Sequence, residues 1–264
     1  MSSDPARAPS DPGLFGPRSV AWELCRERSV AAMAPRAVIL QYAHPAFAAA
    51  SHAYAATGRF ERALRTLSET VFADRETALA HARRVCRMHA RLKGRTDAGL
   101  DWSATDPDAL AWVLVTLLDA TVRGTELVRG RLPDPRVARF LAEARDFGAL
   151  YGVRPDDVPV DRAALDRRVD DAVRSVLVVG PEVHALWRWM VGDSPYGPLL
   201  ARWIGATLPP EIALALGTPR RLSRPLLRGA RWVGALVRLA PERVRYTSLY
   251  RTRAAAFDPG RAHG

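Results

Sequence analysis

The segment that most restricts how this chain can fold is a long apolar run over residues 108–128, DALAWVLVTLLDATVRGTELV. From Leu110 to Leu118 the run is apolar on most faces of a helix, whereas a surface helix carries an apolar stripe on one side only. Such a helix is expected to lie buried at the centre of the fold. Asp119 follows the apolar stretch directly. Because a lone carboxylate in a buried helix commonly caps a helix or pairs with an arginine, we expect Asp119 to be structural.

The rest of the chain predicts more helices and almost no strands. Period-two alternation, the mark of a half-buried strand, is nearly absent, and helical patterns are separated by proline and glycine. We therefore predict an all-α fold: a single domain of about ten helices. The domain is expected at 18–250, between a disordered arm at 1–17 and a flexible tail at 251–264. The proline-punctuated segment 154–160 is the one candidate for an internal domain boundary.

Composition narrows the class of protein. The chain has 264 residues and a net charge of +11, carried almost wholly by arginine, since Lys93 is the only lysine. A GC-rich genome could produce that bias, but a basic surface also attracts anionic partners. Cys25 and Cys86 have no metal-ligand spacing and indicate reduced thiols. The N-terminus lacks a secretory signal, and no apolar run reaches the ~20 residues of a membrane-spanning helix. We expect a cytoplasmic protein, with membrane association as the alternative.

His89 is the first candidate functional residue. It lies in a predicted helix over 78–94, ALAHARRVCRMHARLKG, which Gly94 is expected to end. At helical spacing His89 shares a side with Val85 and Leu92. The opposite side carries Arg83, Arg84, Arg87 and Arg91. A neutral imidazole in an apolar wall suits the axial ligand of a haem iron, but an ordinary core histidine shows the same pattern.

Two more histidines lie in the alanine-rich segment 35–56, PRAVILQYAHPAFAAASHAYAA. Pro45 must kink or restart the helix there. His44 is then held at a break, where its side chain can enter a cavity, and His52 follows eight positions later on a similar face. The structural alternative is a tightly packed helix pair with a capping histidine.

The next predicted helix, residues 59–72, carries a polar pair. Arg62 and Thr66 are four positions apart and project together. Such a pair can hold an anion or polarise a ligand. More often the arginine is solvated and the threonine has no special role.

The C-terminal stretch 220–253 is rich in arginine, with Glu242 as its single acid. Trp232, Leu236 and Val237 interleave with the arginines. The pattern fits a membrane-surface or nucleic-acid face. A solvated helical face is the favoured interpretation, so we expect no specific nucleic-acid partner and keep peripheral membrane contact as the alternative.

Five blocks of this sequence, taken in order, resemble a known family. They read QYAHPAFAA, RFERALRT, HARRVCRMHARLKG, WSATDPDALAWVLVTLLDA and YGVRPDDVPVDRAAL. Each block is weak alone, but their order and spacing are similar to those of the MpaB-type oxygenases, the family that includes the rubber oxygenases called latex-clearing proteins. The resemblance covers roughly residues 18–245.

The resemblance implies an all-helical fold that binds b-type haem. It carries the role of proximal iron ligand to His89, and it places an Arg-x-x-Lys-Thr motif on the distal side, where Arg62 and Thr66 match. These two would donate hydrogen bonds to dioxygen, or Arg62 would pair with a haem propionate. Arg65 stands at the lysine position and cannot ligate iron, because a guanidinium does not lose its proton at working pH. The distal site is then open, or filled by another group such as His44.

The function expected from these residues and the resemblance is a haem b-dependent oxygenase or oxidoreductase acting on a small hydrophobic molecule with dioxygen. Polyisoprene cleavage is not expected, because no export signal is present. One alternative is a non-haem metal enzyme, with candidate ligands His44, His52, His89, Glu61 and Asp119. The other is a cofactor-free helical protein whose 220–253 stretch binds anionic lipid or nucleic acid. The oligomeric state cannot be deduced from the sequence.

Overall fold

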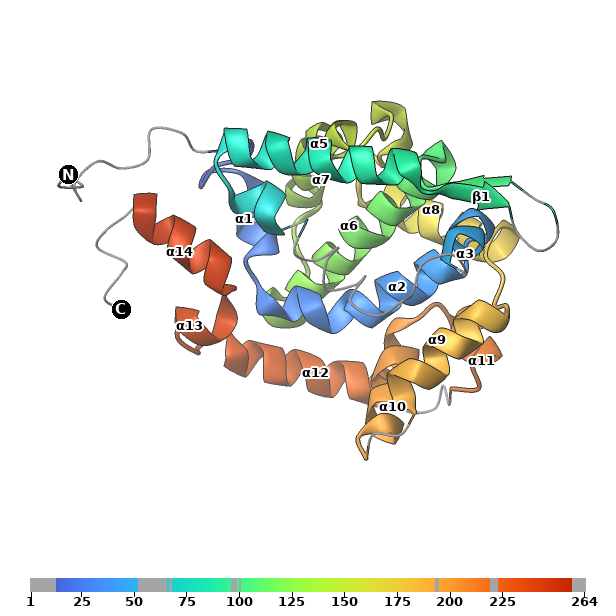
Figure 1. The fold of residues 1–264 in the computed structure, drawn as a ribbon. Helices are drawn as coiled ribbons and strands as arrows, with labels where there is room; N and C mark the ends of the chain where they lie inside the picture. The colour runs from blue at the N-terminus through green and yellow to red at the C-terminus, as the bar shows by residue number, and fades with distance from the viewer. Residues whose placement is uncertain are drawn as a thin grey trace.

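A computed structural model shows the fold (Figure 1), and it describes residues 13–51, 66, 68–95, 99, 101–192, 195–218 and 223–257. Helices dominate, so the predicted all-α class is confirmed. Several helices are short, such as α1 (Val20–Cys25), α11 (Pro210–Ala215) and α13 (Glu242–Arg245). The helices are therefore more numerous than the ten or so expected. No helix within the described ranges is long and apolar enough to cross a membrane.

Helix α6 (Pro107–Arg129) is the central helix, as predicted. It begins where the Asp106 carboxylate accepts a hydrogen bond of 2.8 Å from the Ala109 amide, and it buries fourteen of its residues. Around it pack η1 (Arg28–Met33), α2 (Ala34–Tyr42), α8 (Arg162–Ser175) and α12 (Ser223–Val237). The apolar faces that the sequence shows on all sides of α6 are thus covered by separate elements.

The break that Pro45 predicts is present. Helix α2 ends at Tyr42, and α3 (Pro45–Ser51) begins at the proline. The His44 carbonyl accepts hydrogen bonds from the Phe47 and Ala48 amides at 3.0 and 2.9 Å. His44 therefore occupies the start of α3 in the manner of a capping residue.

A short hairpin interrupts the helices, and the sequence did not predict it. Helix α5 (Arg75–Arg91) is followed by β1 (Lys93–Arg95), which pairs antiparallel with β2 (Asp101–Ser103). Gly94 lies in β1 opposite Trp102, so its predicted role as the end of the helix is wrong. A Cβ at Gly94 would come within 3.0 Å of the Trp102 indole nitrogen, which explains the glycine. Strands of three residues are too short to show alternation.

The second half of the chain adds helices to the same core. Val153 and Val158 flank the short helix η2 (Pro155–Asp157), and both are buried in the main core cluster. The chain therefore continues in one core past the candidate boundary at 154–160. Helix α7 (Asp134–Leu150) comes before this segment. After it the chain forms α8, then α9 (Pro181–Val191), α10 (Gly197–Thr207), α11 and α12.

Aromatic rings join the two ends of the described chain. The Trp22 ring of α1 lies 5.4 Å from Phe72, 5.9 Å from Tyr250 and 5.8 Å from Phe257, between ring centroids. Tyr250 and Phe257 belong to α14, the last helix, which spans residues 248–257. Phe15 also packs against the core. The packed fold therefore includes residues on both sides of the predicted 18–250 domain.

A buried carboxylate makes a second connection between the ends. Glu27 is 1% exposed and accepts hydrogen bonds from Arg129 at 2.8 Å and Arg245 at 2.7 Å. Glu27 also forms an isolated β-bridge with Tyr246. The segment after α12 is therefore held against α1 and η1 by charge as well as by packing.

Candidate functional site

Helix α5 carries His89 in its last turn. The helix begins earlier than Ala78, because the Asp74 carboxylate caps it and accepts from the Thr77 amide at 2.8 Å and the Thr77 hydroxyl at 2.9 Å. These hydrogen bonds lower the pKa of Asp74. An N-cap of this kind satisfies amides that have no partner within the helix.

The inward stripe of α5 leads to His89. Ala78 and Ala82 are buried, and Val85 and His89 continue the stripe as half-buried residues. Met88 beside them is 43% exposed. The predicted arginine face is confirmed, because each of its four members is exposed: Arg83, Arg84, Arg87 and Arg91. The imidazole therefore lies on the protein-facing side of α5, opposite the charged side.

The hairpin places His89 and His44 at the same end of the molecule. Strand β1 follows α5 directly, β2 leads into α6, and α3 packs against β2 (Figure 1). The last turn of α5, the break before α3 and the first turns of α6 therefore meet beside the hairpin. We call this region the hairpin end.

His44 rests against the first turns of α6. Its ring stacks on Trp112, with centroids 6.0 Å apart and planes at 27°. Trp112 is fixed by an indole hydrogen bond of 2.8 Å to the Leu40 carbonyl. Burial lowers the pKa of His44, although the charges of Asp106 and Asp108 oppose the shift. The imidazole is therefore neutral near pH 7, and its buried Nδ1 has no hydrogen-bond partner among the described residues.

Thr66 contacts a histidine that the sequence reasoning did not single out. Its hydroxyl lies 3.2 Å from Nε2 of His81. On the other side of that ring, Nδ1 lies 2.9 Å from the Arg84 guanidinium and 3.1 Å from the Glu69 carboxylate. Burial lowers the pKa of His81. His81 precedes His89 by eight residues, about 12 Å along the helix.

Further polar contacts attach α5 and the residues just before it to the end of α7. The Tyr151 hydroxyl lies 2.6 Å from the Thr70 hydroxyl, and the Cys86 thiol donates to the Leu150 carbonyl at 3.3 Å. Burial raises the pKa of both Tyr151 and Cys86. Cys86 is therefore a protonated, structural thiol.

Asp119 has the structural role that the sequence predicted. Its two oxygens each accept a hydrogen bond of 2.6 Å, one from Arg36 and one from Arg123. Burial alone would raise the pKa of Asp119, but the two guanidinium groups hold it below its usual value. A carboxylate occupied in this way is not available to a metal, so its place among the candidate metal ligands is wrong.

The described part of the chain shows no other non-haem metal site. Among the residues that the structure describes, no three His, Cys, Asp or Glu side chains lie close enough together to hold a metal ion. Four of the predicted site residues fall outside the described ranges: Arg62, Arg65, His52 and Glu61.

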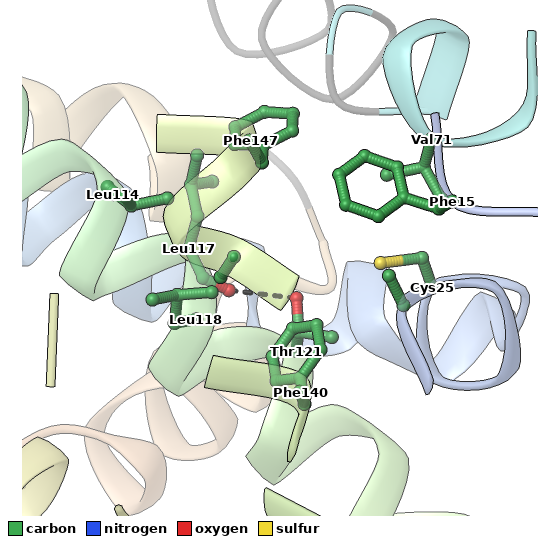
Figure 2. A pocket seen from close by; sticks show the side chains of 11 residues that line it. Phe15, Cys25, Val71, Leu114, Leu117, Leu118, Thr121, Phe140 and Phe147 are labelled. Carbon is green, nitrogen blue, oxygen red and sulfur yellow. Dashed lines mark hydrogen bonds between the residues drawn. The ribbon is translucent and has the colours of Figure 1, made fainter. Parts of the chain in front are cut away.

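A small cavity lies between α1, α6 and α7, and the side chains that line it are mostly apolar (Figure 2). Phe15, Leu118 and Phe147 are among the side chains around it, and the Thr121 hydroxyl there donates back to the Leu117 carbonyl at 2.8 Å. Its volume of about 20 Å³ holds one or two water molecules. Cys25 faces it, and burial raises the thiol pKa to about 12. Because that thiol stays protonated and the remaining lining is almost wholly apolar, we assign this small cavity no catalytic role.

Comparison with known proteins identifies the family. The sequence model described as "ER-bound oxygenase mpaB/B'/Rubber oxygenase, catalytic domain" matches residues 22–239. The chain belongs to this mpaB/rubber oxygenase family. The match runs from α1 to the end of α12, so the hairpin end lies within the oxygenase domain, whereas α13 and α14 follow it. The protein is accordingly an enzyme of the oxygenase type. No curated protein and no solved structure matched the chain.

The hairpin end of this mpaB-type domain has features that suit a haem. His89 offers an imidazole at the end of an apolar stripe, and His44 has a buried ring nitrogen without a described partner. Sequence reasoning missed Trp112 and His81. His81 could have been found, because positions 81, 85 and 89 share one helix face. Trp112 could not, since it meets His44 only through the fold.

Proposed function

We propose that the protein is a haem b-dependent oxygenase that acts on a small hydrophobic molecule. The observation that supports this most is the position of His89, half-buried at the end of the Ala78–Ala82–Val85 stripe of an oxygenase-family domain. An apolar wall keeps an imidazole neutral, which is the form that ligates iron. When bound, haem would supply the capacity to activate dioxygen.

The residues around the proposed site would have separate tasks. His89 would hold the group from α5. Trp112 and the alanines of α5 would exclude water from it, and an apolar wall of this kind favours a hydrophobic substrate. His44, kept neutral by burial, would offer Nδ1 as a hydrogen-bonding or ligating atom. His89, Trp112 and His44 come from three separate segments, so the proposed tasks depend on how these segments pack beside the hairpin.

The donors predicted on the distal side are Arg62 and Thr66. Both can donate a hydrogen bond to an oxygen that gains negative charge. Thr66 is held by His81, which would fix the direction of its hydroxyl. Arg65 would keep its positive charge and serve a propionate or the surface rather than the iron.

The test is an absorbance titration of the purified protein with hemin. We expect a Soret band that saturates near one haem per chain in the wild type and is lost in His89→Ala. His184→Ala is the matched control, because His184 is also a half-buried helical histidine, on α9. The ferrous protein with carbon monoxide then reports whether the distal side is open. A wild type without a Soret band, or His89→Ala with a full one, would contradict the proposal.

A further inference from the structure

Helix α12 is oriented by close contact with α6. Gly234 is buried against it, and a Cβ added there would overlap the Leu127 carbonyl oxygen. Trp232 and Leu236 are each two positions from Gly234, or 200° around the helix, so they point away from the core. The packing of one glycine thus determines which face of α12 reaches the surface.

That outer face is apolar. Trp232 is 76% exposed, Val233 61%, Leu236 69% and Leu239, just past the helix end, 84%. Pro225 and Gly229 extend the same face by two turns, and open space surrounds Gly229. Scattered exposed apolar residues are ordinary, but a contiguous group with a tryptophan marks an interaction surface. We call Trp232, Val233, Leu236 and Leu239 the α12 apolar face.

Arginines border this face. Arg228 lies one turn before Trp232, Arg231 is adjacent to it, and Arg238 and Arg243 follow. All four are exposed, and none forms an ion pair with a described residue. The side chains therefore present positive charge beside an apolar strip.

The charge pattern selects among possible partners. A symmetric contact with a second copy would bring these arginines together, with Glu242 as the neighbouring acid, so like charges would oppose it. A nucleic acid would use the arginines but leave the aliphatic side chains without a partner. An anionic bilayer suits both, because tryptophan and leucine enter the interface while arginines meet lipid phosphates.

We propose that the α12 apolar face and its arginine border dock the protein on the surface of an anionic phospholipid membrane. The helix would lie in the plane of the interface. Leu127, which α12 covers, is fifteen residues from Trp112 on α6, about 22 Å along the helix. In Figure 1, α12 and α5 lie on opposite sides of the molecule. Lipid docking and haem binding can therefore be tested separately.

The experiment is co-sedimentation of the full chain with vesicles of phosphatidylcholine alone or mixed with phosphatidylglycerol. We expect at least about 10-fold stronger partitioning onto the mixed vesicles, weakening as salt rises. Trp232→Ser with Leu236→Ser should lower partitioning about 10-fold or more. Val160→Ser with Leu214→Ser is the matched control, because these apolar side chains are 58% and 69% exposed on other elements. The control should bind like the wild type.

A second pair of variants tests whether vesicle binding depends on the arginines beside the α12 apolar face or only on the net charge of the protein. Changing Arg228, Arg231 and Arg238 to Gln should reduce binding about 10-fold or more. The same change at Arg83, Arg87 and Arg91, on the outer side of α5, removes equal charge and should have a much smaller effect. Equal losses in both triples, or equal binding to both vesicle types, would overturn the proposal.

Light scattering after size-exclusion chromatography tests whether a second copy of the chain, rather than a membrane, covers the α12 apolar face. A wild-type dimer that Trp232→Ser with Leu236→Ser converts to a monomer would assign the α12 apolar face to a second copy and overturn the membrane proposal. Circular dichroism of each variant shows that it is folded, so loss of binding reports the surface itself.

Discussion

Helices α5 and α6 are both long, yet they relate to the core in opposite ways. Helix α6 buries fourteen residues, among them Trp112 and the ion-paired Asp119, whereas α5 buries only Ala78 and Ala82. Helix α6 is therefore firmly anchored in the core, whereas α5 is held more loosely. Side chains from all around hold α6, while α5 is attached by one narrow stripe and a few polar contacts. A helix held in this way can respond to what binds its last turn.

The largest expected effect concerns the ion pairs of α6. Asp119→Asn leaves Arg36 buried without its charge partner, which should lower the free energy of unfolding by about 3–5 kcal/mol. Urea denaturation measures it. Asp171→Asn is the control, because the exposed Asp171–Arg174 pair is worth at most about 0.5 kcal/mol. A loss below about 1 kcal/mol for Asp119→Asn would mean that α6 does not depend on this network.

The next largest effect is the change in stability and hydrogen exchange that haem binding should produce in α5 relative to α6. Haem at 100 times its dissociation constant should stabilise the wild type by about 2.7 kcal/mol. If His89 holds the group, hydrogen exchange should slow more in α5 than in α6, which is already buried. His89→Ala should show neither change, and His184→Ala should show both. Equal slowing in the two helices would contradict the difference between them.

Matched valines compare the two helices directly. Val115→Ala in α6 removes methyl groups from a fully buried site and should cost about 2 kcal/mol. Val85→Ala in α5 acts at a half-buried site and should cost less than about 1 kcal/mol. Both are read from denaturation midpoints without haem. Equal costs would show that α5 is held as firmly as α6.

The smallest effect is a pH dependence at the contact between His44 and α6. Burial lowers the pKa of His44, so the unfolded chain takes up a proton before the folded one does. This histidine's contribution to stability is therefore complete above about pH 6.5 and declines as the pH falls through that value. His44→Gln should flatten the fall in stability between pH 7.5 and 5.5. His81 shifts in the same direction, so His81→Gln is the parallel measurement.

Features set by a single residue's chemistry could be predicted from the sequence. Pro45 had to interrupt a helix, and the carboxylate of Asp119, placed beside an apolar run, had to find arginines. The hairpin was missed because Gly94 and Trp102 identify a strand pair only once they face each other. Short strands carry no period, and their pairing is a property of the fold.

In the candidate site too, some features could be predicted from the sequence and others depend on the fold. The place of His89 on the inner side of α5 follows from helical spacing alone. The stacking of His44 on Trp112, 68 positions away, and the contact of Thr66 with His81 depend on how helices pack. The exposed face of α12 was also hidden, because the sequence shows an amphipathic pattern but not which side Gly234 turns inward. The spacing of residues in the sequence shows which face of a helix a side chain lies on, but the packing of the helices determines which residues it contacts.

The buried Glu27 has a consequence for synthesis of the chain. Its partner Arg245, and the rings of Tyr250 and Phe257 that surround Trp22, belong to the last part of the described chain to leave the ribosome. Until they emerge, the nascent protein holds a carboxylate and an indole that lack part of their final neighbours, because Arg129 and Phe72 have been made but these later residues have not. Closure of the fold therefore waits until residues 245–257 have left the ribosome, and ribosome-bound chains that stop before residue 245 should remain sensitive to protease.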